Sequence, residues 1–394
     1  MKYALMSYNY TTNLGNEVQS IAARRFLPKI DYYIDHEKIH LFNKEKDVKM
    51  IMNGWYLDSP EAWPPSDYID PLLVSMHFNT STNNKKRVES LLTDESLNYL
   101  SSHEPIGCRD IHTVNFLKEH NIDAYFSGCL TLTLDSGKDN DSTIDEGYIV
   151  INSSIPNEIY SLIKEKTNKE IYFIQQDAIP SFDRAFPETM PKWLYNLSSF
   201  YNYKEKFFIA ENILKLYENA SCVITDRLHC ALPCLAFKTP VLLLNNRGMR
   251  ERFNGLNDLL NETSINEYKN DYNMFDVENP PENSNRYLKI RKDLIEKCKK
   301  FTGHVNSSYY SKLSNKDIIN KNTLIISRNG YETRNYMVEV LNMAEKYQKE
   351  IDNLKKINNN QKTELEKQKK IIDEMKNSNS WKITSPLRKI RNRK

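Results

Sequence analysis

The feature that most constrains the fold is an alternation, from Lys2 to about Asn245, of short β-branched and aromatic runs with helical patterns. The apolar runs are continuous, which is typical of parallel strands buried on both faces. The pattern therefore predicts α/β architecture, with parallel sheets covered by helices on both faces. The expected strands are 3–8, 31–34, 49–56, 72–78, 105–108, 124–129, 147–152, 171–176, 222–225 and 241–244. The expected helices are 17–26, 110–120, 157–166, 183–197, 204–219 and 228–237.

One break in the pattern divides this region into two domains. Residues 135–146 supply Asp, Ser, Gly and Asn but no apolar pattern, so we interpret them as a linker. The prediction is an N-terminal domain over 1–134 and a C-terminal domain over 147–304, which suits a chain of 394 residues. A further helix at about 285–301 could close either domain, and the pattern does not decide which.

The chain changes character beyond Val305. We expect a second linker over 305–336, a coiled coil over 337–375 and a basic tail over 376–394. Asn358 falls at a core heptad position, where asparagine fixes the register of a parallel two-stranded coil. Three of the twelve core positions are polar, so a solvated single helix or a disordered segment is the alternative.

Charge and hydropathy narrow the class of protein. The last 14 residues hold six Lys or Arg and no acid, so a net charge of +3 leaves the rest of the chain mildly acidic. This argues against a nucleic-acid-binding body and suits weak docking of the tail on an anionic membrane. No window has the roughly 20 uninterrupted apolar residues of a membrane span, and the N-terminus lacks a signal pattern. We expect a cytoplasmic protein, with the tail favouring the inner face of the membrane.

The six cysteines form no CxxC pair, and four of them lie in apolar stretches. A free thiol in such a stretch behaves as a small hydrophobic group. We expect buried, reduced and non-catalytic thiols.

Three polar clusters fall where strands end and helices begin, which is where α/β sheets bind ligands. The first is Asn13-Leu14-Gly15-Asn16-Glu17. Its glycine permits a tight turn and close approach of a ligand, and the helix N-terminus favours an anion or a hydroxyl-rich group. The spacing is not that of a dinucleotide fingerprint, and an ordinary capped turn is the alternative.

The second cluster is Cys108-Arg109-Asp110. An arginine just before a helix joins a planar fork of donors to the positive end of the helix dipole, a combination that suits phosphate or carboxylate. Asp110 can cap that helix. A structural pair between Arg109 and Asp110 is the alternative.

The third cluster is Asp226-Arg227-Leu228-His229, at the start of a helix that follows a strand. Arg227 can hold an anion, and the helix N-terminus makes His229 harder to charge. A histidine satisfied by a backbone carbonyl is the alternative.

Together these motifs resemble the polysaccharide pyruvyl transferase family. The resemblance covers about residues 1–300 and implies two Rossmann-like domains facing a cleft, as in B-type glycosyltransferases, with the acceptor side in the first and the donor side in the second. It implies transfer of a pyruvyl group from phosphoenolpyruvate to a sugar of a bacterial cell-surface polysaccharide, such as a capsule or exopolysaccharide, or of its lipid-linked precursor, forming a ketal. The motifs that carry it are Asp226-Arg227-x-His229 with Pro240-Val241, Cys108-Arg109-Asp110 with Ser127-Gly128-Cys129-Leu130, and Asn13-x-Gly15-x-x-x-Gln19.

The resemblance also implies roles for individual residues. Arg227 and His229 become the donor-binding and acid–base residues. Asn16 is a departure, because many members have Asp directly after the motif glycine. The further expected donor ligands are Arg109, Arg247 and Arg250, and the expected acceptor ligands are Asn13, Gly15, Glu17 and His77.

The chemistry of this donor agrees with the residue types. Phosphate and carboxylate groups call for arginine, and protonation of the methylene carbon calls for one acid of near-neutral pKa, for which His229 qualifies. We expect no metal or cofactor, since the sequence has no HExxH motif or Cys/His cluster. Expected partners are the donor, the sugar acceptor, a second copy bound through the coiled coil, and the membrane surface.

Two other functions stay open from sequence alone. One is a nucleotide-sugar glycosyltransferase of the same fold. The other is a non-catalytic glycan-assembly protein whose coiled coil recruits partners.

Overall fold

The computed structural model describes residues 1–9, 11–57, 59–80, 85–135, 147–178, 202–245, 251–309, 325–326, 328–386 and 388. Residues up to Val338 belong to one compact unit, and residues from Glu339 onward belong to a second. The predicted helix 183–197 and linker residues 136–146 lie outside the described residues.

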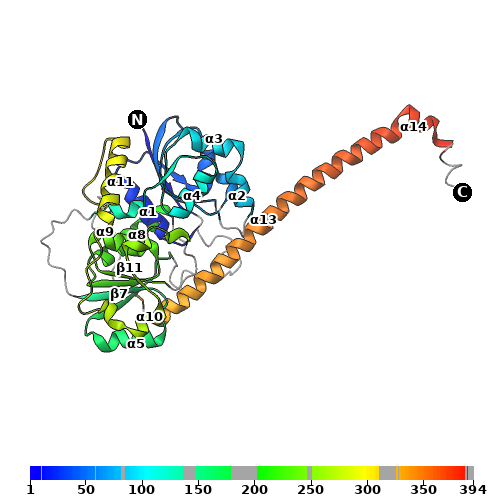
Figure 1. The fold of residues 1–394 in the computed structure, drawn as a ribbon. Helices are drawn as coiled ribbons and strands as arrows, with labels where there is room; N and C mark the ends of the chain where they lie inside the picture. The colour runs from blue at the N-terminus through cyan, green and yellow to red at the C-terminus, as the bar shows by residue number, and fades with distance from the viewer. Residues whose placement is uncertain are drawn as a thin grey trace. The chain divides into compact units, whose positions relative to one another are not determined.

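The first sheet has six strands, all parallel, in the order β2-β1-β3-β4-β5-β6. Figure 1 shows this domain in blue to cyan. Its strands are nearly continuous apolar runs, and Met50 and Met76 at its centre are fully buried. The strands are β1 (Tyr3–Ser7), β2 (Tyr32–Asp35), β3 (Val48–Tyr56), β4 (Ile69–Phe78), β5 (Ile106–Cys108) and β6 (Ala124–Phe126). The helices of this domain are α1 (Gly15–Arg24), η1 (His36–Leu41), η2 (Pro60–Ala62), α2 (Lys85–Leu91), α3 (Asp94–Ser102), α4 (Ile111–Glu119) and η3 (Leu130–Thr133).

The second sheet also has six strands, in the order β11-β10-β9-β7-β8-β12, and its edge strand β12 alone is antiparallel. Its strands are β7 (Tyr148–Asn152), β8 (Glu170–Ile174), β9 (Cys222–Thr225), β10 (Val241–Leu244), β11 (Asn261–Thr263) and β12 (Ile325–Ile326). The accompanying helices are α5 (Asn157–Lys166), α8 (Tyr203–Glu218), α9 (Leu228–Phe237), η5 (Glu251–Phe253), η6 (Asn257–Leu259), α10 (Ile265–Asn270) and η7 (Tyr272–Phe275). The prediction of two parallel-sheet α/β domains is confirmed.

One apolar cluster joins the two domains. It contains residues of α1 and η3 from the first domain and of α8 and α9 from the second. Leu14, Leu130, Leu214 and Leu232 are fully buried within it. The start of α1 is therefore held against the second domain by apolar packing as well as by the polar contacts described below.

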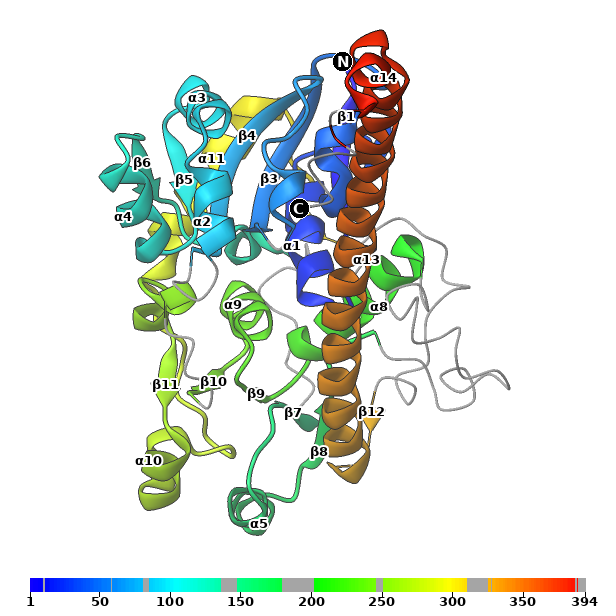
Figure 2. The same ribbon diagram turned by 90° about the vertical axis from the view of Figure 1, so that its right-hand side faces the viewer.

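The helix left open by the sequence, α11 (Tyr287–Thr302), returns to the first domain. Arg291 donates to the carbonyls of Leu132 and Leu134 at 2.7 and 2.8 Å, and Lys49 donates to the Phe301 carbonyl at 3.0 Å. Figure 2 shows α11, in yellow, beside the strands of the first sheet. This helix therefore packs on the first domain, and the predicted bounds of the two domains stay a prediction.

The predicted linker 305–336 contains ordered structure at its end. Strand β12 pairs with β8, and helix α13 (Arg328–Asn377) begins nine residues before the first heptad position, Met337. Tyr331 is 1% exposed and lies with its ring centroid 6.0 Å from that of Phe173. The heptad pattern missed this turn of helix because its contacts are with the second sheet and do not follow a heptad period.

The second unit contains the remainder of α13 and the short helix α14 (Asn379–Ile383). Within the described ranges, no helix is long and apolar enough to cross a membrane. All six cysteines are free and buried, as expected from their sequence context, and their lack of a catalytic role stays a prediction.

Candidate active site

The loop between β1 and α1 touches the second domain. Asn13 forms an isolated antiparallel bridge with Asp177, and its Oδ1 accepts from the Gly15 N–H at 3.0 Å. A Cβ at Gly15 would lie 3.0 Å from Gln176 Nε2 and 3.0 Å from His229 Nδ1. Glycine suits this position because a side chain would press on Gln176 and His229 of the second domain. The predicted acceptor ligands Asn13 and Gly15 therefore lie beside the predicted acid–base residue.

Arg109 follows β5 and is 1% exposed. Its Nη1 group donates to Gln19 Oε1 at 3.2 Å and lies 3.4 Å from His229 Nε2. Its Nε–H has no hydrogen-bond partner, and no carboxylate in the described part of the chain forms an ion pair with it. Because a buried charge without an opposite charge costs several kcal/mol, an anion placed beside Arg109 would be strongly stabilised.

His229 lies in the first turn of α9, with φ −83° and ψ 17°. Since a guanidinium can only donate, its contact with Arg109 is a hydrogen bond when Nε2 is unprotonated. Burial, and then the charges of Arg109, Arg252 and His77, lower the pKa of His229 well below its ordinary value. The imidazole is therefore held neutral by burial and by nearby cations, and the predicted effect of the helix N-terminus stays a prediction.

Arg227 is the N-cap residue of α9 and has acidic neighbours. Its Nη2 atom lies 3.0 Å from Asp177 Oδ2, and its Nε lies 3.9 Å from Asp226 Oδ1. The Asp177 side chain is 2% exposed. The positive charge of Arg227 is thus balanced by the protein itself, unlike that of Arg109.

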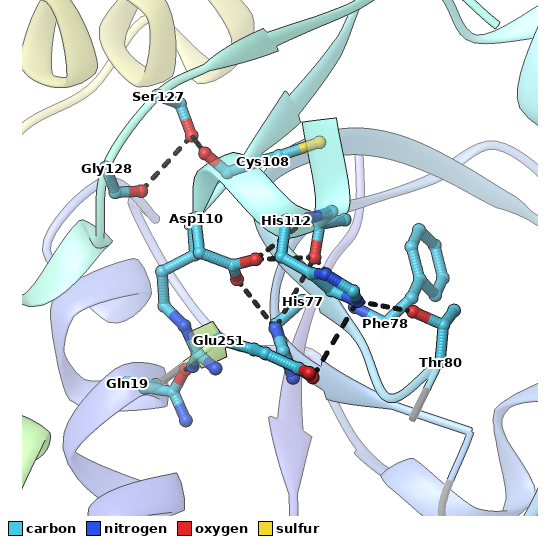
Figure 3. Close-up of polar contacts among 12 residues, drawn as sticks. Gln19, His77, Phe78, Thr80, Cys108, Asp110, His112, Ser127, Gly128 and Glu251 are labelled. Atoms are coloured by element: carbon cyan, nitrogen blue, oxygen red, sulfur yellow. Dashed lines mark hydrogen bonds and ion pairs between the residues drawn. The ribbon is translucent and has the colours of Figure 1, made fainter. Parts of the chain in front are cut away.

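A second buried histidine lies at the end of β4, and Figure 3 shows its contacts. His77 Nδ1 lies 2.6 Å from Asp110 Oδ2, and the other oxygen of Asp110 accepts from both the N–H and the hydroxyl of Thr113 at 2.9 Å. Burial would raise the pKa of Asp110, but the hydrogen bond from His77 and the charge of Arg109 outweigh burial and lower it. Asp110 caps α4, as predicted, and also carries a negative charge against His77.

The contacts continue from the first domain to the second through α4. His112 Nε2 lies 2.8 Å from Thr80 Oγ1 and 4.0 Å from Glu251 Oε2, as Figure 3 also shows. The Ile111 N–H donates to the Asn254 carbonyl at 3.1 Å. The residues after β5 are therefore fixed from both domains.

Glu17 occupies a different environment from the other predicted acceptor ligands. Its side chain is fully buried, with Oε1 3.7 Å from Nζ of Lys206, which belongs to α8 of the second domain. Lys206 also donates to the carbonyls of Tyr8 and Thr11. Burial raises the pKa of Glu17 to about 7 although Lys206 opposes the shift. The carboxylate forms an interdomain ion pair, and its contact with an acceptor stays a prediction.

The structure brings together Asn13, Gly15, Arg109 and His229 from three separate sequence motifs. Arg247 and Arg250 lie outside the described residues. Asp177 and Lys206 were missed from the sequence, because each acts on a partner far away in the chain. Gln19 was part of the motif that carried the family resemblance, but nothing in the sequence showed that it faces Arg109. In the described ranges, no group of three or more His, Cys, Asp or Glu residues could hold a metal ion.

Two parallel-sheet α/β domains that place a buried arginine and a buried histidine at their strand ends define the class of two-domain α/β proteins. The model of the polysaccharide pyruvyl transferase family matches residues 13–248, which is more than half of the chain. The chain belongs to that family. All the described site residues except those of η5 lie within the matched region.

No curated protein matches the chain. Among solved structures, an MnaA–UDP complex from S. aureus is similar, with 10% sequence identity and a TM-score of 0.37 over 78% of this chain and 94% of that one.

Proposed function

We propose that the protein transfers a pyruvyl group from phosphoenolpyruvate to a sugar of a cell-surface polysaccharide or its lipid-linked precursor, forming a ketal. The observation that carries the proposal is the contact of a buried, unbalanced guanidinium with a histidine, Arg109 with His229 at 3.4 Å. An anion site beside an acid–base group is what this donor requires. Membership of the family supports the same reaction.

In the proposed reaction, Arg109 binds the phosphate or the carboxylate of the donor. His229 protonates the methylene carbon, which leaves an oxocarbenium-like centre on the neighbouring carbon. One sugar hydroxyl adds to that centre, phosphate leaves, and a second hydroxyl closes the ketal. Arg227, Arg247 and Arg250 stay proposed as further donor ligands, and the proposal includes no metal or cofactor.

The donor would also supply the condition under which His229 becomes an acid. Without a ligand, burial and the charge of Arg109 keep the pKa of His229 low. A bound phosphate or carboxylate would offset that positive charge and raise the pKa again. Protonation of His229 is therefore coupled to donor binding, so His229 becomes an acid only when the donor is bound.

The first experiment compares donors. Purified protein is incubated with phosphoenolpyruvate or with nucleotide sugars, and its thermal unfolding is measured. A ligand that binds only the folded state adds about 2.7 kcal/mol at a hundredfold excess over Kd. We expect stabilisation by phosphoenolpyruvate alone, and ketal formation on a panel of sugars detected by NMR. Stabilisation by a nucleotide sugar alone would indicate a glycosyltransferase instead.

We further propose that α13 pairs with a second copy of the chain. From Tyr347 onward, one face of the helix carries exposed apolar side chains at heptad core positions. These residues are Tyr347, Ile351, Leu354, Leu365, Ile372 and Met375. Burying such a face is the usual source of coiled-coil stability, and Asn358 between them would set the register.

The charges beside this face favour parallel helices. In a parallel pair in register, Glu350 faces Lys355 of the partner subunit, and Glu364 faces the partner's Lys369. In an antiparallel pair, the positions of Lys355, Lys362, Lys369 and Lys376 would face one another, so lysine would oppose lysine. The proposed dimer is therefore parallel.

Cysteine cross-linking tests the dimer. Leu365→Cys should form an intermolecular disulfide with itself, because equal positions meet only in a parallel coil in register. Lys367→Cys, on the outer face of the helix, is the matched control and should not. Truncation after residue 346 should give a monomer that keeps the buried Tyr331 and its activity. Cross-linking of both variants at one rate would contradict the proposal.

We also propose that the basic tail contacts anionic lipid. The Arg388 guanidinium lies 3.7 Å from the centroid of the Trp381 ring, which places a cation and an amphipathic ring together. Ile383 beside them is exposed. Each basic residue near an anionic surface adds about 1 kcal/mol of binding, so association with vesicles should weaken as salt rises. Equal binding to neutral vesicles would contradict this contact.

A further inference from the structure

The pair formed by His77 and Asp110 has no part in the reaction as proposed so far. The two side chains meet at 2.6 Å, and Thr113 fixes the far oxygen of the carboxylate with two hydrogen bonds of 2.9 Å. Asp110 is 0% exposed and His77 is 4% exposed. A charged carboxylate held so rigidly determines the orientation of the imidazole.

We propose that His77 is the general base that takes the proton from the attacking hydroxyl of the acceptor, and that Asp110 is its positioning residue. This inference rests on the proposed pyruvyl transfer. The sequence predicted that His77 contacts the acceptor, and the proposal adds that His77 removes a proton from it.

The tautomer follows from the geometry. A carboxylate can only accept, so the proton of the neutral imidazole lies on Nδ1, toward Asp110. Nε2 then carries the lone pair, which is the arrangement by which an aspartate prepares a histidine to act as a base. Within the described residues, the hydrogen bonds of the His77 ring are made by Nδ1, to Asp110 and Thr113, and none is made by Nε2.

The position of His77 also agrees with this role. Its ring lies 4.5 Å from that of Trp55, and the Arg252 guanidinium lies 5.9 Å from the Trp55 ring. The charge of Arg252 lowers the pKa of His229, and so does that of His77 when His77 is protonated. The two histidines therefore belong to one site, with Arg109 and Arg252 as the cations and Asp110 as the anion around them.

The proton balance of ketal formation requires a second group. His229 gives a proton to the methylene carbon, so it cannot take the hydroxyl proton in the same step. As the acceptor oxygen bonds to the adjacent carbon, its O–H bond breaks and the proton moves to Nε2 of His77. In the second half, the bond from carbon to phosphate oxygen breaks, phosphate leaves with the electron pair, and His77 returns its proton to it. The second hydroxyl adds likewise, and its proton restores His229.

The chain offers a matched control for a purely structural pair. His36 is also buried and also meets a carboxylate, with Nδ1 3.0 Å from Glu37 Oε1. Its ring lies between the rings of Tyr8 and Tyr56, at 5.2 and 5.0 Å. His36→Gln removes a comparable pair and should leave turnover within a few fold of the wild type.

The experiment measures ketal formation from phosphoenolpyruvate on the 4-nitrophenyl hexoside that the wild type uses best. We expect His77→Ala and Asp110→Asn to lower kcat on the order of 10² to 10⁴, with binding of phosphoenolpyruvate unchanged by calorimetry. Added imidazole should restore part of the activity of His77→Ala, which a structural role would not allow. The Nε2 nitrogen of His77 should show the chemical shift of an unprotonated imidazole nitrogen.

The outcomes separate the two proposals. Folded His77→Ala with wild-type kcat, or equal losses in His77→Ala and His36→Gln without imidazole rescue, would overturn the base assignment alone. A proton found on Nε2 in the free protein would do the same. Wild-type protein that neither binds phosphoenolpyruvate nor forms a ketal would overturn the proposed function, and the base assignment with it.

Discussion

Arg109 and Arg227 occupy equivalent places in the two sheets but have opposite electrostatic surroundings. Each follows the carboxyl end of a parallel strand and precedes a helix, and each stands next to an aspartate in the sequence. Arg227 is paired with Asp177 at 3.0 Å. Arg109 donates to a neutral glutamine and a neutral histidine, while the neighbouring Asp110 turns away to His77.

This difference indicates that the two arginines have different roles. A guanidinium already balanced by a carboxylate stabilises the second domain and gains less from an incoming anion. An unbalanced guanidinium is costly until an anion arrives, so it is suited to bind one. By this argument we expect Arg109 to dominate binding of the proposed donor, although the family motif drew attention to Arg227.

The largest effect is expected at the group that joins the two sides. His229→Ala should lower ketal formation on the order of 10² to 10⁴ in kcat, because it removes the acid. His120→Ala, on the outer end of α4, is a control that should change kcat little. The measurement is the rate of ketal formation at saturating phosphoenolpyruvate. Near-normal turnover in His229→Ala would show that this residue is not the acid.

The balance at Arg227 can be broken directly. Asp177→Asn leaves a largely buried guanidinium without its main partner, so the free energy of unfolding should fall by about 3 kcal/mol. Glu296→Gln breaks an ion pair between two exposed side chains, with Lys292 at 3.8 Å, and should cost less than about 1 kcal/mol. Denaturant titration of both variants checks this. Equal losses would mean that Asp177 does not balance Arg227 more than a surface acid would.

Glu17 is a third buried ionisable group, and its contribution to stability depends on pH. The pKa of Glu17 is about 7 in the folded protein, above its usual value of 4.5. Between these values the folded state binds a proton that the unfolded state does not, so the contribution of Glu17 to stability falls as pH rises. The slope is about 1.4 kcal/mol per pH unit, or up to about 3 kcal/mol in total.

Glu17→Gln should therefore flatten the fall in unfolding free energy between pH 5 and 7. The matched control is Glu165→Gln on the exposed face of α5, which should leave the wild-type slope in place. If the slope of Glu17→Gln equals that of the wild type, the carboxylate is not buried beside Lys206 as described.

The smallest effect on stability is expected at Gly15, which packs beside His229. Gly15→Ala places a methyl group 3.0 Å from His229 Nδ1 and Gln176 Nε2, so the loop must shift by a few tenths of an ångström. We expect a loss of about 1 kcal/mol in unfolding free energy and a larger relative loss of kcat. Thermal unfolding and turnover measure the two. Unchanged values of both would show that the domains need no close contact here.

Most of the fold could be predicted because its signals are local. Continuous apolar runs predicted strands β1 to β10 but not β11, and Asp110 was identified as a helix cap from its position alone. The return of α11 to the first domain could not be predicted, since its apolar stripe would suit either sheet. Short elements such as α2, η5 and β12 lack a periodic pattern long enough to detect.

The sequence indicated several residues that the structure brings together in the candidate site, but it did not indicate which side chains pair with one another. Residues at strand ends were expected to meet, and Asn13, Gly15, Arg109 and His229 do so. Which arginine has an acidic partner depends on Asp177, fifty residues before Arg227 in the sequence. Likewise, the ion pair of Glu17 could not be predicted, because its partner Lys206 lies in another domain.

The central claim is that Arg109 is the main anion site for the donor, and calorimetric binding of phosphoenolpyruvate to two matched variants tests it most directly. Arg109→Lys and Arg227→Lys both keep a positive charge and both lose the planar fork of donors. We predict that Arg109→Lys raises Kd by roughly 10-fold to 100-fold, as expected for lost hydrogen bonds to a charged group, and that Arg227→Lys changes it less than about 3-fold. A larger increase of Kd in Arg227→Lys than in Arg109→Lys would contradict the account.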